Sequence, residues 1–291
     1  MMQAALLKDI ATATGIELRP DAWAAASGGD VSRAGRVTDK KGGDWFLKRL
    51  PTAHGRVLQA EAAGLEELAS AAVLRVPVVK GCGLAGTDSW LLLEYLPLAS
   101  AVQADALLGT GLARLHRVTS PAFGWRCDNF IGLSEQPNCP GENWPEFFAI
   151  QRIGTQLRLA ADNGAPAAFV ADAEALQRRI GDWFVDYRPE ASLLHGDLWS
   201  GNRGALPDGQ PVIFDPAVYY GDRETDLAMT RLFGGFSAGF YTAYEDTWPL
   251  DCGAGRRELL YNLYHVMNHF NLFGAGYLEQ AQSMLATLLR S

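Results

Sequence analysis

The sequence has few cysteines, and they lie far apart along the chain. The four are Cys82, Cys127, Cys139 and Cys252, which form no Cys-x-x-Cys pair and have no paired histidines beside them. This spacing argues against a zinc site and against a disulfide framework. We therefore expect reduced thiols and a cytoplasmic protein.

The sequence also lacks a long apolar run and a block of basic residues. No stretch approaches the ~20 uninterrupted apolar residues that a bilayer-spanning helix needs. Lys8 and Asp9 interrupt the apolar residues of the first fifteen positions, which predict an ordinary helix rather than a signal peptide. The net charge of −8 argues against a nucleic-acid partner but not against a small phosphate ligand. We expect neither a membrane nor a nucleic acid as partner.

The 291 residues, 48% of them hydrophobic, are enough for one large domain or for two lobes that share a cleft. Alternating patterns and turn residues predict strands in the first third, whereas the remainder is rich in helix formers. The expected strands lie at 22–50, 76–79 and 90–95, and the expected helices at 1–15, 53–72, 104–118, 144–162, 171–187, 222–233 and 256–273. This order predicts a two-lobed α+β fold. Residues 1–96 would form an N-terminal lobe of antiparallel sheet plus helix, and residues 97–291 a mainly helical C-terminal lobe.

The segment with the clearest chemistry is Leu-Leu-His-Gly-Asp-Leu-Trp-Ser-Gly-Asn at 193–202, followed by Val-Ile-Phe-Asp-Pro at 212–216. Asp197 follows an apolar strand, Asn202 lies five residues later, and a second strand ends at Asp215. Phosphoryl transfer from ATP needs one carboxylate to orient the attacking hydroxyl, and further oxygens to hold Mg²⁺ against the phosphates. Each residue alone could equally stabilise a turn. The ordered set favours a kinase.

The same residues carry a family resemblance. His-Gly-Asp-Leu-x-x-x-Asn before a strand ending in Asp resembles the catalytic and metal-binding loops of the protein-kinase-like superfamily. Protein kinases carry Arg at the position of Gly196. Glycine at this position of the motif resembles the aminoglycoside, choline and fructosamine kinase branch. The strings NWPEFF, LLHGDLWSGN, DPAVYYGDRETDLAMTRLFGGF and YNLYHVMNHFNLFG resemble the fructosamine/ketosamine 3-kinases. They span about 144–274, with weaker similarity back to Gly28.

The resemblance implies a role for each matching residue. Asp197 would be the catalytic base, and Asn202 and Asp215 the Mg²⁺ ligands. Lys48, at the end of a strand, would contact the α/β phosphates of ATP, and Glu61 on the next helix would pair with it.

Other parts of the nucleotide site are less specific in the sequence. Glu66 and Glu67 are alternative partners for Lys48. Gly28 and Gly29 would let backbone amides approach the phosphates, although a glycine pair between strands also suits a plain hairpin turn. The backbone at Glu94, Tyr95 and Leu96 would hydrogen-bond the adenine edge.

For the acceptor, an aromatic face and several polar side chains are expected. Trp199, beside the base, is the candidate for the aromatic wall. His269 and Asn268 form the polar edge that matches the family, and Asp128 and Asn129 are further candidates. We expect His116 and His265 in the core, and Asp226 as a hydrogen-bonding support of the catalytic loop.

The resemblance implies an ATP- and Mg²⁺-dependent kinase that phosphorylates the C3 hydroxyl of a ketosamine such as a fructosamine, ribulosamine or erythrulosamine. Phosphate on C3, beside the ketone, can leave after enolisation, so the free amine or protein would be released and thus deglycated. The alternatives are an aminoglycoside- or choline-type phosphotransferase and a non-catalytic nucleotide-binding protein. The sequence leaves open the sugar, the oligomeric state, and whether the ketosamine partner is a small molecule or protein-bound.

Overall fold

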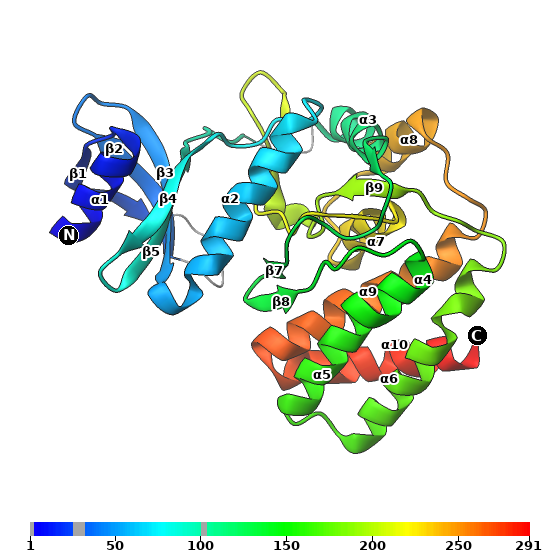
Figure 1. The fold of residues 1–291 in the computed structure, drawn as a ribbon. Coiled ribbons are helices and arrows are strands. Elements are labelled where there is room, and N and C mark those ends of the chain that lie inside the picture. The colour runs from blue at the N-terminus through cyan, green and yellow to red at the C-terminus, as the bar shows by residue number, and fades with distance from the viewer. Residues whose placement is uncertain (1–2, 26–32, 100–103) are drawn as a thin grey trace. The chain divides into compact units, whose positions relative to one another are not determined.

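The structure is a computed structural model that describes residues 3–25, 33–99 and 104–291. The chain divides into two compact units (Figure 1). The first comprises Met1–Ala104 with Gly201–Pro216, and the second comprises Asp105–Ser200 with Ala217–Ser291. In this division residues 97–99 and 201–216, which the sequence placed in the second lobe, group with the first unit.

Hydrogen bonds explain why 201–216 joins the first unit. Its hairpin consists of β10 (Arg203–Ala205) and β11 (Pro211–Ile213). The Ile213 amide donates to the Arg75 carbonyl at 3.0 Å, and the Ala99 amide donates to the Ala205 carbonyl at 2.7 Å. These partners lie more than a hundred residues apart in sequence, so no local pattern predicts them.

The first unit contains a five-stranded antiparallel sheet in the order β1-β2-β3-β5-β4. The strands are β1 (Leu18–Ala25), β2 (Arg33–Asp39), β3 (Asp44–Pro51), β4 (Val79–Ala85) and β5 (Asp88–Glu94). Helices α1 (Ala4–Thr14) and α2 (Gly55–Ser70) lie on opposite sides of this sheet (Figure 1).

Strand alternation decides which side chains meet each helix. Leu47 on β3 and Leu92 on β5 are register partners, and both join the core under α1 with Leu6 and Ile10. The next residue of β3, Lys48, therefore points to the other face of the sheet, where α2 carries Glu61. Adjacent residues of β3 thus face opposite sides of the sheet: Leu47 faces the apolar core, and Lys48 faces the buried charge of Glu61.

The sequence predicted a strand at 76–79, but β4 begins only at Val79 and spans Val79–Ala85. The glycines of β4 explain why the sequence did not predict its full length, because glycine disfavours a strand interior. The structure gives a packing reason for them. A Cβ on Gly83 would lie 2.9 Å from the Trp90 ring, and one on Gly81 would lie 3.5 Å from it. Glycine lets the buried indole lie flat against the neighbouring strand.

The second unit is mainly helical, and the predicted α+β class is confirmed. Helix α9 (Ala254–Phe273) is buried along most of its length and packs against α5, α7 and α10 (Figure 1). The other helices are α3 (Asp105–His116), α4 (Trp144–Phe147), α5 (Thr155–Asp162), α6 (Ala167–Arg179), α7 (Glu224–Leu232), α8 (Ala238–Thr247) and α10 (Leu278–Arg290). The sequence did not predict α8 or α10.

Short strands complete the second unit. The strands β6 (Thr119–Ser120), β9 (Ala191–Leu194) and β12 (Tyr219–Gly221) form one sheet, and β7 (Asn129–Ile131) pairs with β8 (Ser134–Gln136). The helix predicted at 144–162 is interrupted by a π-helical segment at Phe148–Gly154, which carries the buried Arg152. In the ranges described, no helix combines the length and the apolar character that crossing a membrane requires.

Candidate functional site

The loop with Asp197 follows β9, a strand whose four residues are all buried. Gly196 has φ +82°, and a Cβ there would lie 2.0 Å from the Ala217 carbonyl oxygen. Any other residue would clash with backbone, which explains glycine at this position. The turn leaves Asp197 half-buried and Leu198 fully buried.

Asp226 on α7 fixes this loop, as the sequence predicted. Its carboxylate accepts from the backbone amides of His195 and Gly196, both at 2.8 Å, and contacts Nε2 of His116 at 3.1 Å. Burial alone would raise the pKa of Asp226, but the His116 hydrogen bond, with the nearby histidines and the Gly196 amide, lowers it below its usual value. The residue is therefore an ionised anchor for the segment that precedes Asp197.

The first unit contains a buried cluster of charges around Lys48. Its ammonium lies 2.8 Å from both carboxylate oxygens of Glu61 and 2.8 Å from Oδ1 of Asp215. The predicted Lys48–Glu61 ion pair is thus present, and neither Glu66 nor Glu67 takes its place. Burial works against the charged amine, but the two carboxylates outweigh it and raise the pKa of Lys48. Burial also raises the pKa of Glu61, to about 7; the charge of Asp215 adds to this shift, and Lys48 opposes it.

Asn202 and Asp215, the predicted metal ligands, lie together at the ends of the β10–β11 hairpin. The Asn202 side-chain amide donates to the Asp215 carbonyl at 3.4 Å, and the Phe214 amide donates to the Asn202 carbonyl at 3.1 Å. Asp215 has φ +58°, a left-handed conformation that Asp tolerates better than most residues, and its side chain is 40% exposed. A carboxylate and an amide oxygen suit Mg²⁺, which completes its shell with phosphates and water. The donor set therefore fits this ion.

The structure also bears on the predicted adenine contacts. The Glu94 amide donates to the Val78 carbonyl at 2.9 Å, and the Glu94 carboxylate pairs with Arg75. The amide and the carboxylate of Glu94 are therefore engaged within the protein. Contact between the adenine edge and the backbone of Glu94, Tyr95 and Leu96 stays a prediction. Gly28 and Gly29 lie outside the described residues.

Trp199 and His269, predicted for the acceptor site, are connected through a residue that the sequence did not single out. The Phe233 ring centroid lies 6.3 Å from that of Trp199 and 5.0 Å from that of His269. His269 Nδ1 donates to the His265 carbonyl at 2.8 Å, so in the neutral ring Nε2 is the acceptor nitrogen. The available signal for Phe233 was the glycine pair that follows it in the family-matched string.

The remaining acceptor candidates make hydrogen bonds within the fold. Asn268 is buried and accepts from Gln156 at 3.2 Å. Asn129 is buried as well and donates to the Val218 carbonyl at 2.7 Å. Asp128 is exposed and accepts from the Asn138 amide at 2.8 Å. These contacts stabilise the local structure, and a role of the three residues in acceptor binding stays a prediction.

The two histidines expected in the core are buried there. His116 is fully buried, with Nδ1 2.8 Å from the Tyr244 hydroxyl. Burial lowers the pKa of His265 to about 3, so this ring is neutral at physiological pH. Neither histidine is positioned to exchange protons with solvent.

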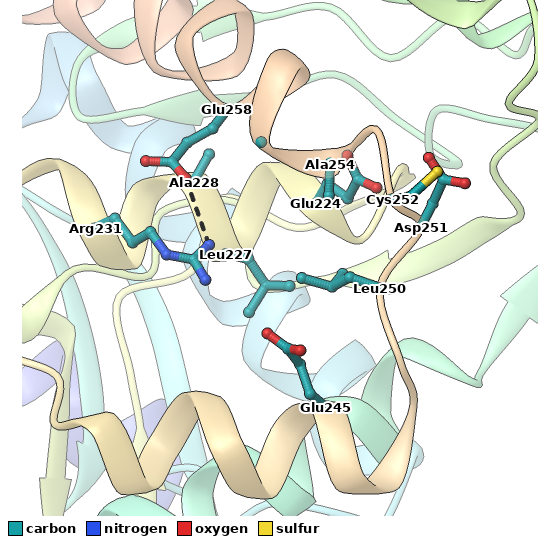
Figure 2. A pocket seen from close by; sticks show the side chains of 11 residues that line it. Glu224, Leu227, Ala228, Arg231, Glu245, Leu250, Asp251, Cys252, Ala254 and Glu258 are labelled. Carbon is teal, nitrogen blue, oxygen red and sulfur yellow. Dashed lines mark ion pairs between the residues drawn. The ribbon is translucent and has the colours of Figure 1, made fainter.

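A pocket of about 410 Å³ opens beside α7, α8 and α9, and none of the predicted site residues is among those that line it (Figure 2). Its walls combine apolar side chains such as Leu227 and Leu250 with carboxylates. Glu258 pairs across it with Arg231 at 3.6 Å (Figure 2), and Asp251 pairs with Arg257 at 2.8 Å. None of the residues predicted for phosphoryl transfer lines this pocket.

Comparison with known proteins gives a consistent result. The sequence matches the fructosamine kinase family over residues 2–291. A probable ketoamine kinase of Synechocystis is 41% identical over 287 residues, which cover 98% of this chain and 96% of the relative. The chloroplastic protein-ribulosamine 3-kinase of Arabidopsis thaliana is 37% identical over 85% of this chain and 77% of its own length. The crystal structure of a putative fructosamine-3-kinase from Thermobifida fusca covers 100% of both chains, with a TM-score of 0.86 and 31% identity.

Proposed function

Because the chain belongs to the fructosamine kinase family, we propose that it transfers the γ-phosphoryl group of ATP to the C3 hydroxyl of a ketosamine. The observation that carries phosphoryl transfer is the buried ammonium of Lys48, held by Glu61 and Asp215. A cation fixed by two carboxylates is presented in one orientation, as phosphate binding requires. The acceptor is inferred from the relatives, which are named as ketoamine and ribulosamine kinases.

Each residue has a defined part in this proposal. Asp197 accepts the proton of the attacking hydroxyl, and Asp226 positions the loop on which Asp197 lies. Lys48 contacts the α/β phosphates. Asn202 and Asp215 hold Mg²⁺, which supplies charge neutralisation for the phosphates when it is bound.

Phosphorylation of the C3 hydroxyl would be sufficient for deglycation. The phosphate lies on the carbon beside the ketone, so enolisation allows inorganic phosphate to leave. Hydrolysis of the resulting unsaturated species then releases the amine. The enzyme itself performs only the phosphoryl transfer. The proposal includes ATP and Mg²⁺ as cofactors. It also includes a cytoplasmic location, because the spacing of the cysteines argues against disulfides.

The alternatives share the fold but have less support. An aminoglycoside- or choline-type phosphotransferase would use the same nucleotide chemistry, and a non-catalytic protein would need only the nucleotide site. Asp197, Asn202 and Asp215 are all present, which favours turnover. The relatives named above favour a ketosamine over the other acceptors.

The test is a competition between acceptors. ADP release is measured with Mg·ATP and, in separate reactions, fructose-, ribulose- and erythrulose-derived ketosamines, choline and an aminoglycoside. We expect turnover with at least one ketosamine at a kcat/KM well above that for the other two classes. A preference for choline or the aminoglycoside would overturn the ketosamine assignment while leaving the kinase assignment intact.

A further inference from the structure

A fully buried arginine of the second unit has no part in the site described above. Arg152 belongs to the π-helical segment Phe148–Gly154, which joins α4 and α5 into one continuous helical run (Figure 1). A π-helix has wider turns than an α-helix and often occurs at functional sites. These turns bring Phe148, Arg152 and Ile153 to the buried side together, each of them 0% exposed. The π-helical segment thus places a permanent cation in the core.

Neutral groups hold the guanidinium of Arg152. Nη1 donates to the Pro137 carbonyl and Nη2 to Oδ1 of Asn138, both at 2.6 Å. Cζ lies 3.9 Å from the centroid of the Tyr219 ring and 4.8 Å from that of Phe147. In the part of the chain that the structure describes, its hydrogen bonds go to carbonyl and amide oxygens and none goes to a carboxylate. Fixed neutral oxygens and ring faces therefore replace its hydration shell.

A series of buried side-chain amides begins at Arg152. Because Oδ1 of Asn138 accepts from Arg152, its Nδ2 is left to donate, and it does so to Oδ1 of Asn129 at 2.8 Å. The same oxygen of Asn129 accepts from Nε2 of Gln136 at 2.9 Å. Oε1 of Gln136 accepts from the Tyr264 hydroxyl at 2.7 Å. We call Asn138, Asn129 and Gln136 the amide chain. Arginine can only donate, so it fixes the direction of every hydrogen bond in the amide chain.

The amide chain ends on two backbone carbonyls. Nε2 of Gln136 donates to the Ala217 carbonyl at 3.0 Å, and Nδ2 of Asn129 donates to the Val218 carbonyl at 2.7 Å. Asn129, Gln136 and Asn138 are at most 3% exposed. Buried donors and acceptors of this kind have to find their partners within the protein. The amide chain therefore determines where the backbone at 217–218 lies.

The same backbone supports the turn that precedes Asp197. The Ala217 amide donates to the His195 carbonyl at 2.9 Å. The Ala217 carbonyl lies so close to Gly196 that a Cβ there would be 2.0 Å from its oxygen. Asp226 binds the two amides of this turn, and Ala217 binds its carbonyl. The position of Asp197 thus depends on the backbone that the amide chain holds.

Two tyrosines also relate the guanidinium to this loop. Tyr219, whose ring lies against Arg152, is the register partner of Leu194 in the pairing of β12 with β9. Burial raises the pKa of Tyr264; the charge of Arg152 opposes this shift, and the charge of Asp197 adds to it. The phenol of Tyr264 therefore lies within electrostatic range of both the buried cation and the proposed base.

We propose that Arg152 is a positioning residue for phosphoryl transfer: it orients the amide chain, which holds the backbone against which the Asp197 loop is packed. This inference rests on the proposed kinase function. A neutral side chain of similar volume would avoid the cost of burying a cation. The planar fork of arginine supplies two donors in a fixed geometry, which a neutral side chain or a lysine does not.

Arg152→Lys tests the geometry while it keeps the charge. The parent and the variant are compared with Mg·ATP and the ribulose adduct of Nα-acetyl-lysine amide, at a temperature at which circular dichroism shows both to be folded. We expect kcat to fall at least ~10-fold, because a displacement of about 1 Å at the reacting groups can cost about 10²-fold. KM for either substrate should stay within about twofold of the parental value, since a misplaced base affects only the transition state.

A double variant separates positioning from a general loss of stability. Because Arg152 is proposed to act through Asp197, Arg152→Lys should have almost no further effect on the residual turnover of Asp197→Asn. An effect through stability alone would lower turnover by the same factor in both backgrounds. Equal factors in the two backgrounds would therefore overturn the inference.

Gln136→Met provides a second route if the Arg152 variant folds poorly. Methionine keeps the length of the side chain and removes the donor to the Ala217 carbonyl. We expect the same pattern as for Arg152→Lys, with a lower kcat and an almost unchanged KM. This loss too should disappear in the Asp197→Asn background.

Arg223→Lys is the matched control. Arg223 is another buried arginine, 7% exposed, that donates to the Trp248 carbonyl at 2.9 Å and to the Pro249 carbonyl at 2.6 Å. Its Cζ lies 4.0 Å from the centroid of the Trp248 ring. These partners follow the end of α8, outside the amide chain. The control should therefore lose stability in urea unfolding but keep the parental kcat.

The outcomes distinguish this inference from the function on which it rests. A parental kcat in folded Arg152→Lys or in folded Gln136→Met, or an equal loss of kcat in Arg223→Lys, would overturn the role of Arg152 alone. Absence of turnover with every ketosamine in the parent protein would overturn the proposed function and this inference with it. A loss of kcat that is confined to the Arg152 and Gln136 variants, and that Asp197→Asn abolishes, would support both.

Discussion

The ammonium of Lys48 lies as close to Asp215 as to Glu61, at 2.8 Å from each carboxylate. Lys48 and Glu61 come from β3 and α2, whereas Asp215 follows the β10–β11 hairpin. One cation thus connects the sheet, the helix and the proposed metal site within the first unit. Its removal should affect both folding and nucleotide binding.

Lys48→Met should destabilise the protein by about 3–5 kcal/mol, because it leaves the buried carboxylate of Glu61 without its cation. Adding Glu61→Gln should restore part of this loss, since the second change removes one of the uncompensated charges. Urea unfolding of the parent and of the single and double variants measures the coupling. Additive losses in the double variant would show that Lys48 and Glu61 do not stabilise each other.

Asp197→Asn should reduce turnover at least ~10²-fold with ATP binding largely retained, as expected for loss of a positioned general base. Asp246→Asn, at an exposed position on α8, is the control and should keep parental turnover. Turnover of Asp197→Asn within a few-fold of the parent would remove Asp197 from this role.

Asp226→Asn should behave differently from Asp197→Asn. An amide offers one oxygen where the carboxylate offers two, so one buried backbone amide of the catalytic loop loses its acceptor. The expected cost is about 1–3 kcal/mol of stability together with reduced turnover. Urea unfolding compares the two variants. If Asp226→Asn kept full stability, the anchoring hydrogen bonds at His195 and Gly196 would not have the importance assigned to them.

Asp215→Ala should weaken Mg·ATP binding more than it weakens metal-free ATP binding, because the carboxylate contacts the metal in the proposed complex. Calorimetric titration with and without Mg²⁺ measures the two affinities independently of turnover. The same loss in both titrations would indicate that Asp215 acts only through Lys48.

Asp222 predicts a pH dependence of stability. Its buried carboxylate accepts hydrogen bonds from Tyr261 at 2.5 Å and from Tyr187 at 3.0 Å. Burial, with a further contribution from the charge on Glu224, raises its pKa from 3.8 to about 7. The folded protein therefore binds more protons than the unfolded chain between about pH 4 and pH 7. Stability contributed by this group is complete below that window and is lost as the pH rises through it.

Asp222→Asn isolates this effect, because the amide does not titrate in that range. Urea unfolding midpoints of the parent and the variant are compared from pH 4.5 to pH 8. The parent should lose more stability than the variant as the pH rises. Parallel curves would show that the Asp222 carboxylate is ionised throughout, in spite of its burial.

Local patterns predicted the parts of the site that lie within single elements. The strand with Lys48, the helix with Glu61 and the loop with Asp197 each have a composition that identifies them. Partners distant in sequence were not predictable in this way. Pairing of the β10–β11 hairpin with Arg75 and Ala99 depends on backbone hydrogen bonds, which no side-chain pattern specifies.

The direction in which side chains point from a helix was the other feature that the sequence did not predict. Asn268 and His269 are neighbours on α9, yet the first is buried against Gln156 and the ring of the second lies beside that of Phe233. A helical step of about 100° separates them, so a sequence match alone does not say which one faces the acceptor. Phe233 was overlooked because its place beside Trp199 depends on a glycine turn that packs against Ser200.

The position of the transferred phosphate distinguishes a ketosamine 3-kinase from other phosphotransferases. The protein is incubated with Mg·ATP and the ribulose adduct of Nα-acetyl-lysine amide, and the early product is examined by ³¹P–¹H correlation NMR. We expect a phosphate coupled to the proton on C3, followed by release of inorganic phosphate and the free lysine amine. A phosphate on another carbon, or ATP hydrolysis without a phosphorylated sugar, would contradict the proposed function.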